Sequence, residues 1–348
     1  MQQKLLIALA GIAATAVALT GCSSAATPTT SASAGSSTPT GAITVYNAQH
    51  EELTRAWADE FTAQTGVTVT LRNGSDSELG NQIAQEGQAS PADVFLTENS
   101  PAMSLVDNAG LFADVDSATI AQVPAEYRPS SGKWVGIAAR STVLAYNPAM
   151  ISEAALPKSL MNLADPAMKG QWAASPSGAD FQAIVSAMLE LKGADATEAW
   201  LVAMKANFTA YQGNGTVMKA VNSGEIPMGI IYHYYWFGDQ DGTGENSNNT
   251  ALHYFKNADP GAFISLSGGG VLASSANPTA AQAFLAFVTS KAGQTVLQTG
   301  TSFEYPVASD VAANPALVPL PELDAPVVDA SKLNSTTVTD LMTKAGLI

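Results

Sequence analysis

The sequence "AITVYNAQHEELTRAWADEFTAQTGVTVTLRN" (42–73) predicts a strand, a helix and a second strand. The β-branched run at 42–48 is followed by an amphipathic pattern that begins near Glu51. Gly66 is of the residue type that commonly ends a helix, and the second strand, 67–73, follows it directly. This order indicates a parallel sheet with helices packed on its faces.

The same alternation continues along the rest of the chain. Further predicted elements are a helix at 76–87, a strand at 92–98, a helix at 101–110, a strand at 171–175, helices at 180–192 and 196–207, strands at 228–232 and 268–274, and a helix at 279–293. About 300 residues follow the first predicted strand, which is long for one hydrophobic core. We therefore expect an α/β protein of two lobes.

The N-terminal segment has the composition of an export signal. Residues 5–19 are apolar but too few to span a bilayer comfortably, so we interpret 1–21 as a signal peptide. Leu19-Thr20-Gly21-Cys22 resembles a bacterial lipobox, which implies that Cys22 carries a lipid anchor outside the cytoplasm. The alternative is an unmodified thiol beside an ordinary cleavage site. Residues 22–41 contain almost only small and polar residues and are predicted to be a flexible tether.

The charge and the cysteine content exclude several classes of partner and site. The formal net charge is −15, and so acidic a surface repels phosphate backbones, which argues against a nucleic-acid partner. Acidity suits the capture of cations, although it also serves solubility alone. Cys22 is the only cysteine, so no disulfide within the chain and no cysteine-rich metal site is expected.

Polar side chains follow three predicted strands at the edge where α/β sheets bind ligands. His50 follows the first strand, Glu98 the third, and Tyr234 and Tyr235 the strand 228–232. Side chains alternate along a strand, so adjacent tyrosines can share one ligand only beyond its end. Taken singly, each residue has a structural explanation: a helix cap for the histidine, a helix N-terminal charge for the glutamate, and packing for the tyrosines.

Together these four side chains form a donor set suited to a trivalent ion. Phenolates and carboxylates are hard oxygen ligands, and two tyrosinates with one glutamate supply three negative charges. A tyrosine with a pKa near ~10 ionises at neutral pH only beside a strong positive charge, which Fe³⁺ supplies better than Ca²⁺ or Mg²⁺. The pattern therefore favours ferric ion.

The segments "ITVYNAQHEEL", "ADVFLTEN", "ARSTVLAYN" and "NSGEIPMGIIYHYYW" resemble those of bacterial ferric-ion-binding proteins, the bacterial transferrins of iron(III) ABC importers. The resemblance extends from about residue 42 to the end of the chain. It implies a type II periplasmic-binding-protein fold, with β-strand hinges and an interlobe cleft. The expected first lobe is 42–142 with 265–312, and the expected second lobe is 143–264 with 313–348.

The resemblance also implies roles for individual residues. His50 and Glu98 of the first lobe, with Tyr234 and Tyr235 of the second, would bind Fe³⁺. A carbonate or phosphate anion would complete the coordination, with Asn214, Ser177 and Gly178 as expected anion contacts. The pattern departs from the family at Ala138, which replaces a hydroxyl residue, and at Tyr232, which replaces an amide. Tyr146 is a possible further ligand or a packing residue, and His233 is expected to point away from the metal.

The resemblance implies a binding protein that captures ferric iron and delivers it to an ABC permease and its ATPase, and the lipobox-like sequence adds a lipid anchor; we expect a monomer. The alternative is the same fold binding another solute, such as a polyamine, thiamine, an oxyanion or a ferric chelate. An enzymatic function is not expected, because no G-x-S-x-G or H-E-x-x-H motif occurs and no G-K-[ST] follows the glycines 268–270.

Overall fold

Three parallel strands near the start of the folded chain form the sheet predicted from residues 42–73. The computed structural model describes residues 39–348, so the predicted signal peptide, Cys22 and most of the tether lie outside the described residues. β1 (Ala42–Asn47) lies between β2 (Thr68–Asn73) and β3 (Val94–Leu96) and runs parallel to both. The predicted parallel sheet is confirmed.

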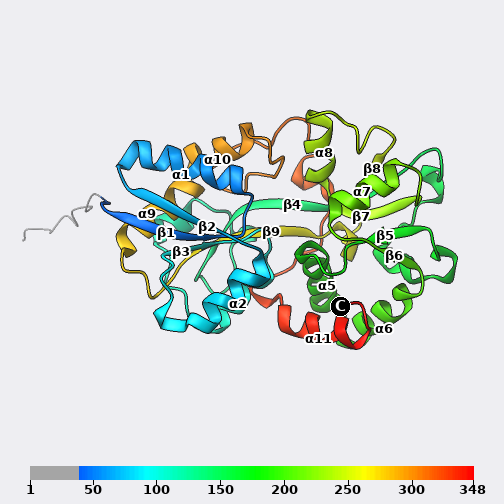
Figure 1. Cartoon of the computed structure of the whole chain (residues 1–348), viewed down its shortest axis with the longest axis horizontal. Coiled ribbons are helices and arrows are strands. Elements are labelled where there is room, and N and C mark those ends of the chain that lie inside the picture. The colour runs from blue at the N-terminus through cyan, green and yellow to red at the C-terminus, as the bar shows by residue number, and fades with distance from the viewer. Residues whose placement is uncertain (1–38) are drawn as a thin grey trace, which may run out of the picture. The chain divides into compact units, whose positions relative to one another are not determined.

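A long central strand joins this sheet to a second group of strands. β4 (Val135–Tyr146) pairs antiparallel with β9 (Ile264–Val271) up to Ser141, and from Thr142 onward with β7 (Met228–Tyr232). Beyond β7 lie the parallel strands β5 (Trp172–Ala174) and β6 (Phe208–Ala210), while β8 (Ala251–His253) pairs with the end of β4. In Figure 1, β4 and β9 run side by side between the two groups.

The change of partner in β4 coincides with the predicted lobe boundary. β4 leaves β9 between Ser141 and Thr142, one residue from the expected division at 142/143. β9 begins at Ile264, next to the other expected division at 264/265. The extents of the two lobes stay a prediction, but the strand pairing is that expected of a hinge.

Helices cover both faces of the sheet, as the buried side chains on both faces of β1 require. Ile43 and Val45 pack with α1 and α9 on one face, and Tyr46 belongs to the hydrophobic cluster on the other. The helices are α1 (Glu51–Thr65), α2 (Asp76–Glu86), α3 (Ser100–Asn108), α4 (Ser117–Ala121), α5 (Ala179–Lys192), α6 (Ala194–Lys205), α7 (Asn214–Asn222), α8 (His233–Asp241), α9 (Pro278–Thr289), α10 (Lys291–Thr299) and α11 (Ser335–Lys344). None of the helices in 39–348 is long and apolar enough to cross a membrane.

Two predicted elements differ from the structure. The helix expected at 279–293 is two helices, because Ser290 has extended backbone angles and its hydroxyl accepts the N–H of Gly293 to begin α10. The strand expected at 268–274 is β9, which begins earlier and ends at Val271. Gly66 does end α1, in the left-handed conformation expected of it.

The glycines 268–270 serve the packing of β9. A Cβ atom at Gly270 would lie 2.7 Å from the ring of Phe112, and one at Gly269 would lie 2.7 Å from Leu285. No side chain fits there without displacing buried neighbours. These glycines therefore allow β9 to lie between β3 and β4 under a close layer of side chains.

We expect Gly270→Ala to lower the free energy of unfolding by about 1–3 kcal/mol, because the added methyl group overpacks a rigid aromatic contact. Urea unfolding of the iron-free protein measures this. Gly215→Ala is the matched control, since Gly215 lies in α7 where an added Cβ atom would meet no atom within 4 Å, and it should leave stability unchanged or slightly higher. Equal stability of Gly270→Ala and the unmodified protein would contradict the packing role.

Candidate metal centre

The four predicted ligands lie together in the structure. His50 is the N-cap residue of α1 after β1, Glu98 follows β3, and Tyr234 and Tyr235 are in the first turn of α8 after β7. His50 Nδ1 lies 3.6 Å from Glu98 Oε1. The His50 and Tyr234 rings meet edge to face at 4.9 Å, and the two tyrosine rings stack at 4.3 Å.

α8 is what directs both tyrosines to the same side. β7 ends at Tyr232, and the helix α8 begins at the next residue, so both tyrosines lie beyond the strand end as expected. His233 points elsewhere, as expected: its Nδ1 accepts the N–H of Ser141 at 3.1 Å, and its ring stacks on Tyr305. Tyr234 is buried, and its hydroxyl has no hydrogen-bond partner among the described residues.

A cavity of about 520 Å³ opens onto three of the four predicted ligands. His50, Tyr234 and Tyr235 line it together with Glu51 and Glu52 of α1 and residues at the end of α10. Glu98 lies beside His50 with about a quarter of its side chain exposed. The cavity is thus acidic at its rim and carries nitrogen and phenol donors on its wall.

Burial raises the pKa values of the two phenols and of the glutamate in this site. Burial and the nearby Asp180 carboxylate raise the pKa of both Tyr234 and Tyr235 above the usual value. Burial, reinforced by Asp180 and Glu304 and opposed by Arg140, raises the pKa of Glu98 to about 8. Burial lowers the pKa of His50, so its imidazole is neutral and free to act as a ligand near neutral pH. Only a strongly charged cation displaces protons from such phenols.

A buried ion pair behind the site escaped prediction from the sequence. Arg140, in the middle of β4, is fully buried and pairs with the fully buried Glu304. Arg140 also donates to the Glu98 carbonyl, and its guanidinium carbon lies 5.5 Å from the centre of the Tyr234 ring. A single arginine within the apolar run "VGIAARSTVLAY" was the available signal, because a buried arginine requires an acidic partner.

The ion pair is connected to His50 as well. Glu304 Oε2 and His50 Nε2 are both buried, neither has a hydrogen-bond partner in the described chain, and the two atoms are 4.0 Å apart. Arg140 holds the pKa of Glu304 below its usual value despite the cost of burial, so this carboxylate is ionised. Its charge is balanced by Arg140 and is not available to balance a metal ion.

The residues expected to contact an anion are hydrogen-bonded to other groups of the chain. Asn214 Nδ2 donates to Asp180 Oδ2 at 2.7 Å, so a carboxylate of the chain already occupies that amide. The exposed Ser177 hydroxyl donates to Gln212, and the Gly178 N–H donates to the carbonyl of Ser175. Asp180, in the first turn of α5, was not predicted. It is buried, burial raises its pKa, and its carboxyl group bonds the amide of Asn214.

The remaining predicted positions lie at varying distances from the cluster. Tyr146 pairs with Met228, at the opposite end of β7 from Tyr232, which separates it from the site by about 13 Å along the strand. The Tyr232 hydroxyl donates to the backbone carbonyl of Asp180 at 3.2 Å. Ala138 is buried in β4 opposite Ser267.

Tyrosine is essential to any metal site here. Within residues 39–348, His, Cys, Asp and Glu side chains alone form no group of three that could hold a metal ion. The histidine and the glutamate become a plausible site only when the two phenols are counted with them.

In an α/β fold, ligands bind beyond the carboxyl ends of the strands, and the donor cluster lies there. The fold matches that of periplasmic solute-binding proteins. Residues 56–325 match the family model described as bacterial extracellular solute-binding protein, and the chain belongs to this family. The family consists of binding proteins, in agreement with the expectation that this chain is not an enzyme.

The relatives reported next are named as iron-binding or iron-bound proteins. The chain is 67% identical over 306 residues to the Fe(3+)-binding periplasmic protein of Serratia marcescens, covering 88% of this chain and 90% of that one. It is 37% identical to the major ferric iron-binding protein of Neisseria meningitidis, covering 88% and 93%. The crystal structure of iron-bound HitA from Pseudomonas aeruginosa matches with a TM-score of 0.83 at 42% identity, covering 88% and 100%. The predicted resemblance and the periplasmic-binding-protein fold are confirmed.

Proposed function

We propose that this protein binds ferric ion outside the cytoplasm through His50, Glu98, Tyr234 and Tyr235. The observation that carries the proposal is the meeting of two adjacent phenols, one carboxyl group and one neutral imidazole beside a single cavity. Two tyrosinates and one glutamate balance the charge of Fe³⁺, and all three are hard oxygen donors. The named functions of the relatives support the same ligand.

We further propose that Asp180 takes the place of the carbonate or phosphate expected from the resemblance. Its carboxylate accepts a hydrogen bond from Asn214, the residue expected to hold the anion. Among the charged groups near Tyr234 and Tyr235, Asp180 raises their pKa values most. Glu304 adds no net charge to the centre, because Arg140 neutralises it. A carboxylate supplied by the chain makes an external anion unnecessary.

The same fold binding another solute is the alternative. The acidic rim of the cavity disfavours an oxyanion or an anionic ferric chelate, because Glu51 and Glu52 would repel either one. A polyamine or thiamine would use acidic and aromatic walls, but two adjacent phenols with raised pKa values and an imidazole are not required for such a ligand. A ferric charge-transfer band in the visible spectrum distinguishes these cases.

Delivery of the ion requires the site to open. We propose that the predicted lobes close about β4 and β9, because Glu98 and His50 lie on one side of the partner change in β4 and both tyrosines lie on the other. As the binding component of an ABC importer, the protein would then pass iron to a permease and its ATPase. A lower radius of gyration with iron than without it, measured by small-angle scattering, is the expected sign of closure, and equal radii would contradict it.

We also retain the proposal of a lipid anchor at Cys22, which rests on the lipobox-like sequence alone. The anchor would hold the binding protein near its permease. Intact-mass spectrometry of membrane-extracted protein should find a diacylglyceryl group on Cys22, and an unmodified mature chain that begins at another residue would contradict the anchor.

We expect Tyr234→Phe and Tyr235→Phe each to weaken ferric binding by at least about a hundredfold, because each removes one anionic ligand and leaves the ring in place. Competition with citrate measures affinity, and the visible band should weaken or shift. His50→Ala removes a neutral donor that water can replace, so it should cost less. Tyr254→Phe is the matched control, because its hydroxyl is also buried without a partner among residues 39–348 but lies outside the site. Unchanged iron retention and colour in both site variants would refute the function.

We expect Asp180→Asn to make iron retention depend on an added anion. The substitution removes a negative charge beside the phenols, and carbonate or phosphate in the buffer should restore part of the lost affinity. The unmodified protein should bind iron equally well with and without the anion. Asp195→Asn is the control, since Asp195 is an exposed carboxylate in the first turn of α6 and lies outside the site. If the unmodified protein itself requires an anion, Asp180 does not replace one.

A further inference from the structure

Asn99 is placed as a helix cap but is not used as one. It is the N-cap residue of α3, directly after the predicted ligand Glu98, and asparagine is among the best residues for that position. Its side chain makes no capping hydrogen bond, however, and the residue is 1% exposed. A buried amide turned away from its own helix must find its partners elsewhere.

The amide of Asn99 finds them on four different elements. Its nitrogen donates to Asp76 Oδ2 at 3.0 Å and to Asp180 Oδ1 at 2.9 Å. Its oxygen accepts from the Ser265 hydroxyl at 2.8 Å, and the Tyr232 hydroxyl, which donates to the Asp180 carbonyl, lies 3.4 Å from it. These bonds use both donors of the amide and one acceptor site of its oxygen.

The network continues to the proposed iron site on both sides. Asp76 Oδ1 accepts the backbone N–H of Glu98 at 3.0 Å, and Asp180 Oδ2 accepts from Asn214. Asn99 therefore joins α2 of the proposed first lobe to α5 of the second. Asn99 follows the proposed iron ligand Glu98 in the chain, and it bonds the Asp180 carboxylate.

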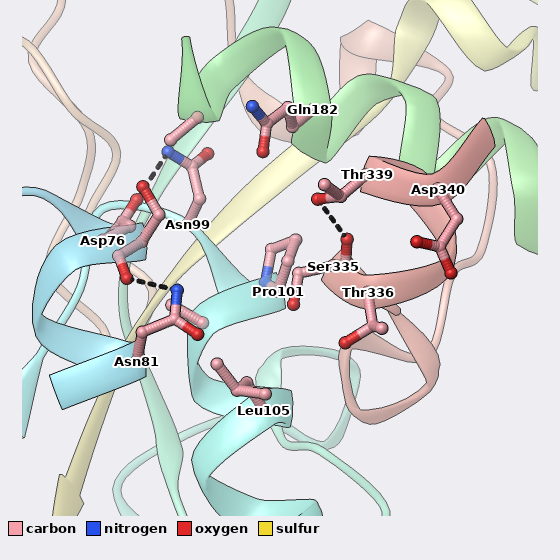
Figure 2. A pocket seen from close by; sticks show the side chains of 13 residues that line it. Asp76, Asn81, Asn99, Pro101, Leu105, Gln182, Ser335, Thr336, Thr339 and Asp340 are labelled. Carbon is pink, nitrogen blue, oxygen red and sulfur yellow. Dashed lines mark hydrogen bonds between the residues drawn. The ribbon is translucent and has the colours of Figure 1, made fainter. Parts of the chain in front are cut away.

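The network borders a second cavity, which lies between α2 and α3 on one side and α5 and α11 on the other. This cavity measures about 270 Å³ and is lined in part by Asp76, Asn99, Gln182, Ser335 and Thr339. Figure 2 shows Asp76 and Asn99 joined at its wall, with Gln182 of α5 and Thr339 of α11 across from them. Separating α5 from α3 would break the Asn99–Asp180 bond and open the contact to solvent.

Two buried carboxyl groups on one amide are costly unless both accept a hydrogen bond from it. An asparagine needed only to cap α3 would bond the backbone N–H groups of that helix. Asn99 bonds Asp76 and Asp180 instead, and so it holds α2, α3 and α5 together. We propose that Asn99 is a positioning residue that fastens the two lobes behind the iron and orients the Asp180 carboxylate toward it. This inference rests on the proposed ferric function. It assigns to Asn99 control over iron release.

The test replaces Asn99 by an isosteric residue that cannot donate. Asn99→Asp should release iron to citrate at least about tenfold faster, because the hydrogen bonds to Asp76 and Asp180 are both lost and a third carboxyl group enters the network. The visible band should shift, since Asp180 would no longer be held in place. Asn81→Ala is the matched control: Asn81 lines the same cavity but bonds only within its own helix, to the Ser77 carbonyl, and release should not change.

The effect must act through Asp180 to support the proposal. In the Asp180→Asn background, Asn99→Asp should add little to the rate of iron release. If Asn99→Asp instead increases that rate by the same factor in both backgrounds, the role of Asn99 is only structural and the proposal is refuted. If Asn99→Asp does not fold, Asn99→Ser, which can still cap α3, replaces it in both backgrounds with the same expectations. Unaltered release and colour in the Asn99 variant, with iron binding still lost in Tyr234→Phe, would overturn the positioning role and leave the ferric function standing.

Discussion

The pairing of β4 with two different partners is the constraint on which the rest of the structure depends. Its first part belongs with β9 and its second with β7, so one continuous strand carries both groups of strands. Arg140 lies next to the point of change, where a buried cation requires an anion. Glu304 supplies that anion from a segment far along the chain, and Arg140 also reaches the Glu98 carbonyl. The hinge strand and the backbone of a proposed ligand are thereby held to one another.

Around this pair the protein gathers more acidic groups than its own cations can balance. Glu98, Asp76 and Asp180 all have raised pKa values, and burial is the first cause in each case. The neighbouring phenols are held in their neutral form for the same reason. Metal binding releases protons from its ligands, and a nearby positive charge favours the ionised form of a carboxyl or phenol group. A trivalent cargo thus agrees with the electrostatics as well as with the kinds of donor.

Much of the fold could be predicted from short segments. The strands at 42–47 and 228–232, the helix after Glu51 and the end of that helix at Gly66 agree with the expectations. The errors have local causes as well. Ser290 interrupts an otherwise continuous helical pattern with a capping bond, and no helix was predicted where α8 forms. Both depend on hydrogen bonds and packing that hydrophobic periodicity does not report.

The sequence alone determined which donors would stand at the strand ends, because a strand's carboxyl end and the residue after it are local properties of the chain. His50, Glu98, Tyr234 and Tyr235 could be named for that reason. Only the tertiary structure decided that Asn214 holds Asp180, that Arg140 pairs with Glu304, and that Asn99 joins Asp76 to Asp180. Each of these contacts links residues more than 20 positions apart, and a buried polar group reveals its partner only once folding has brought both out of water.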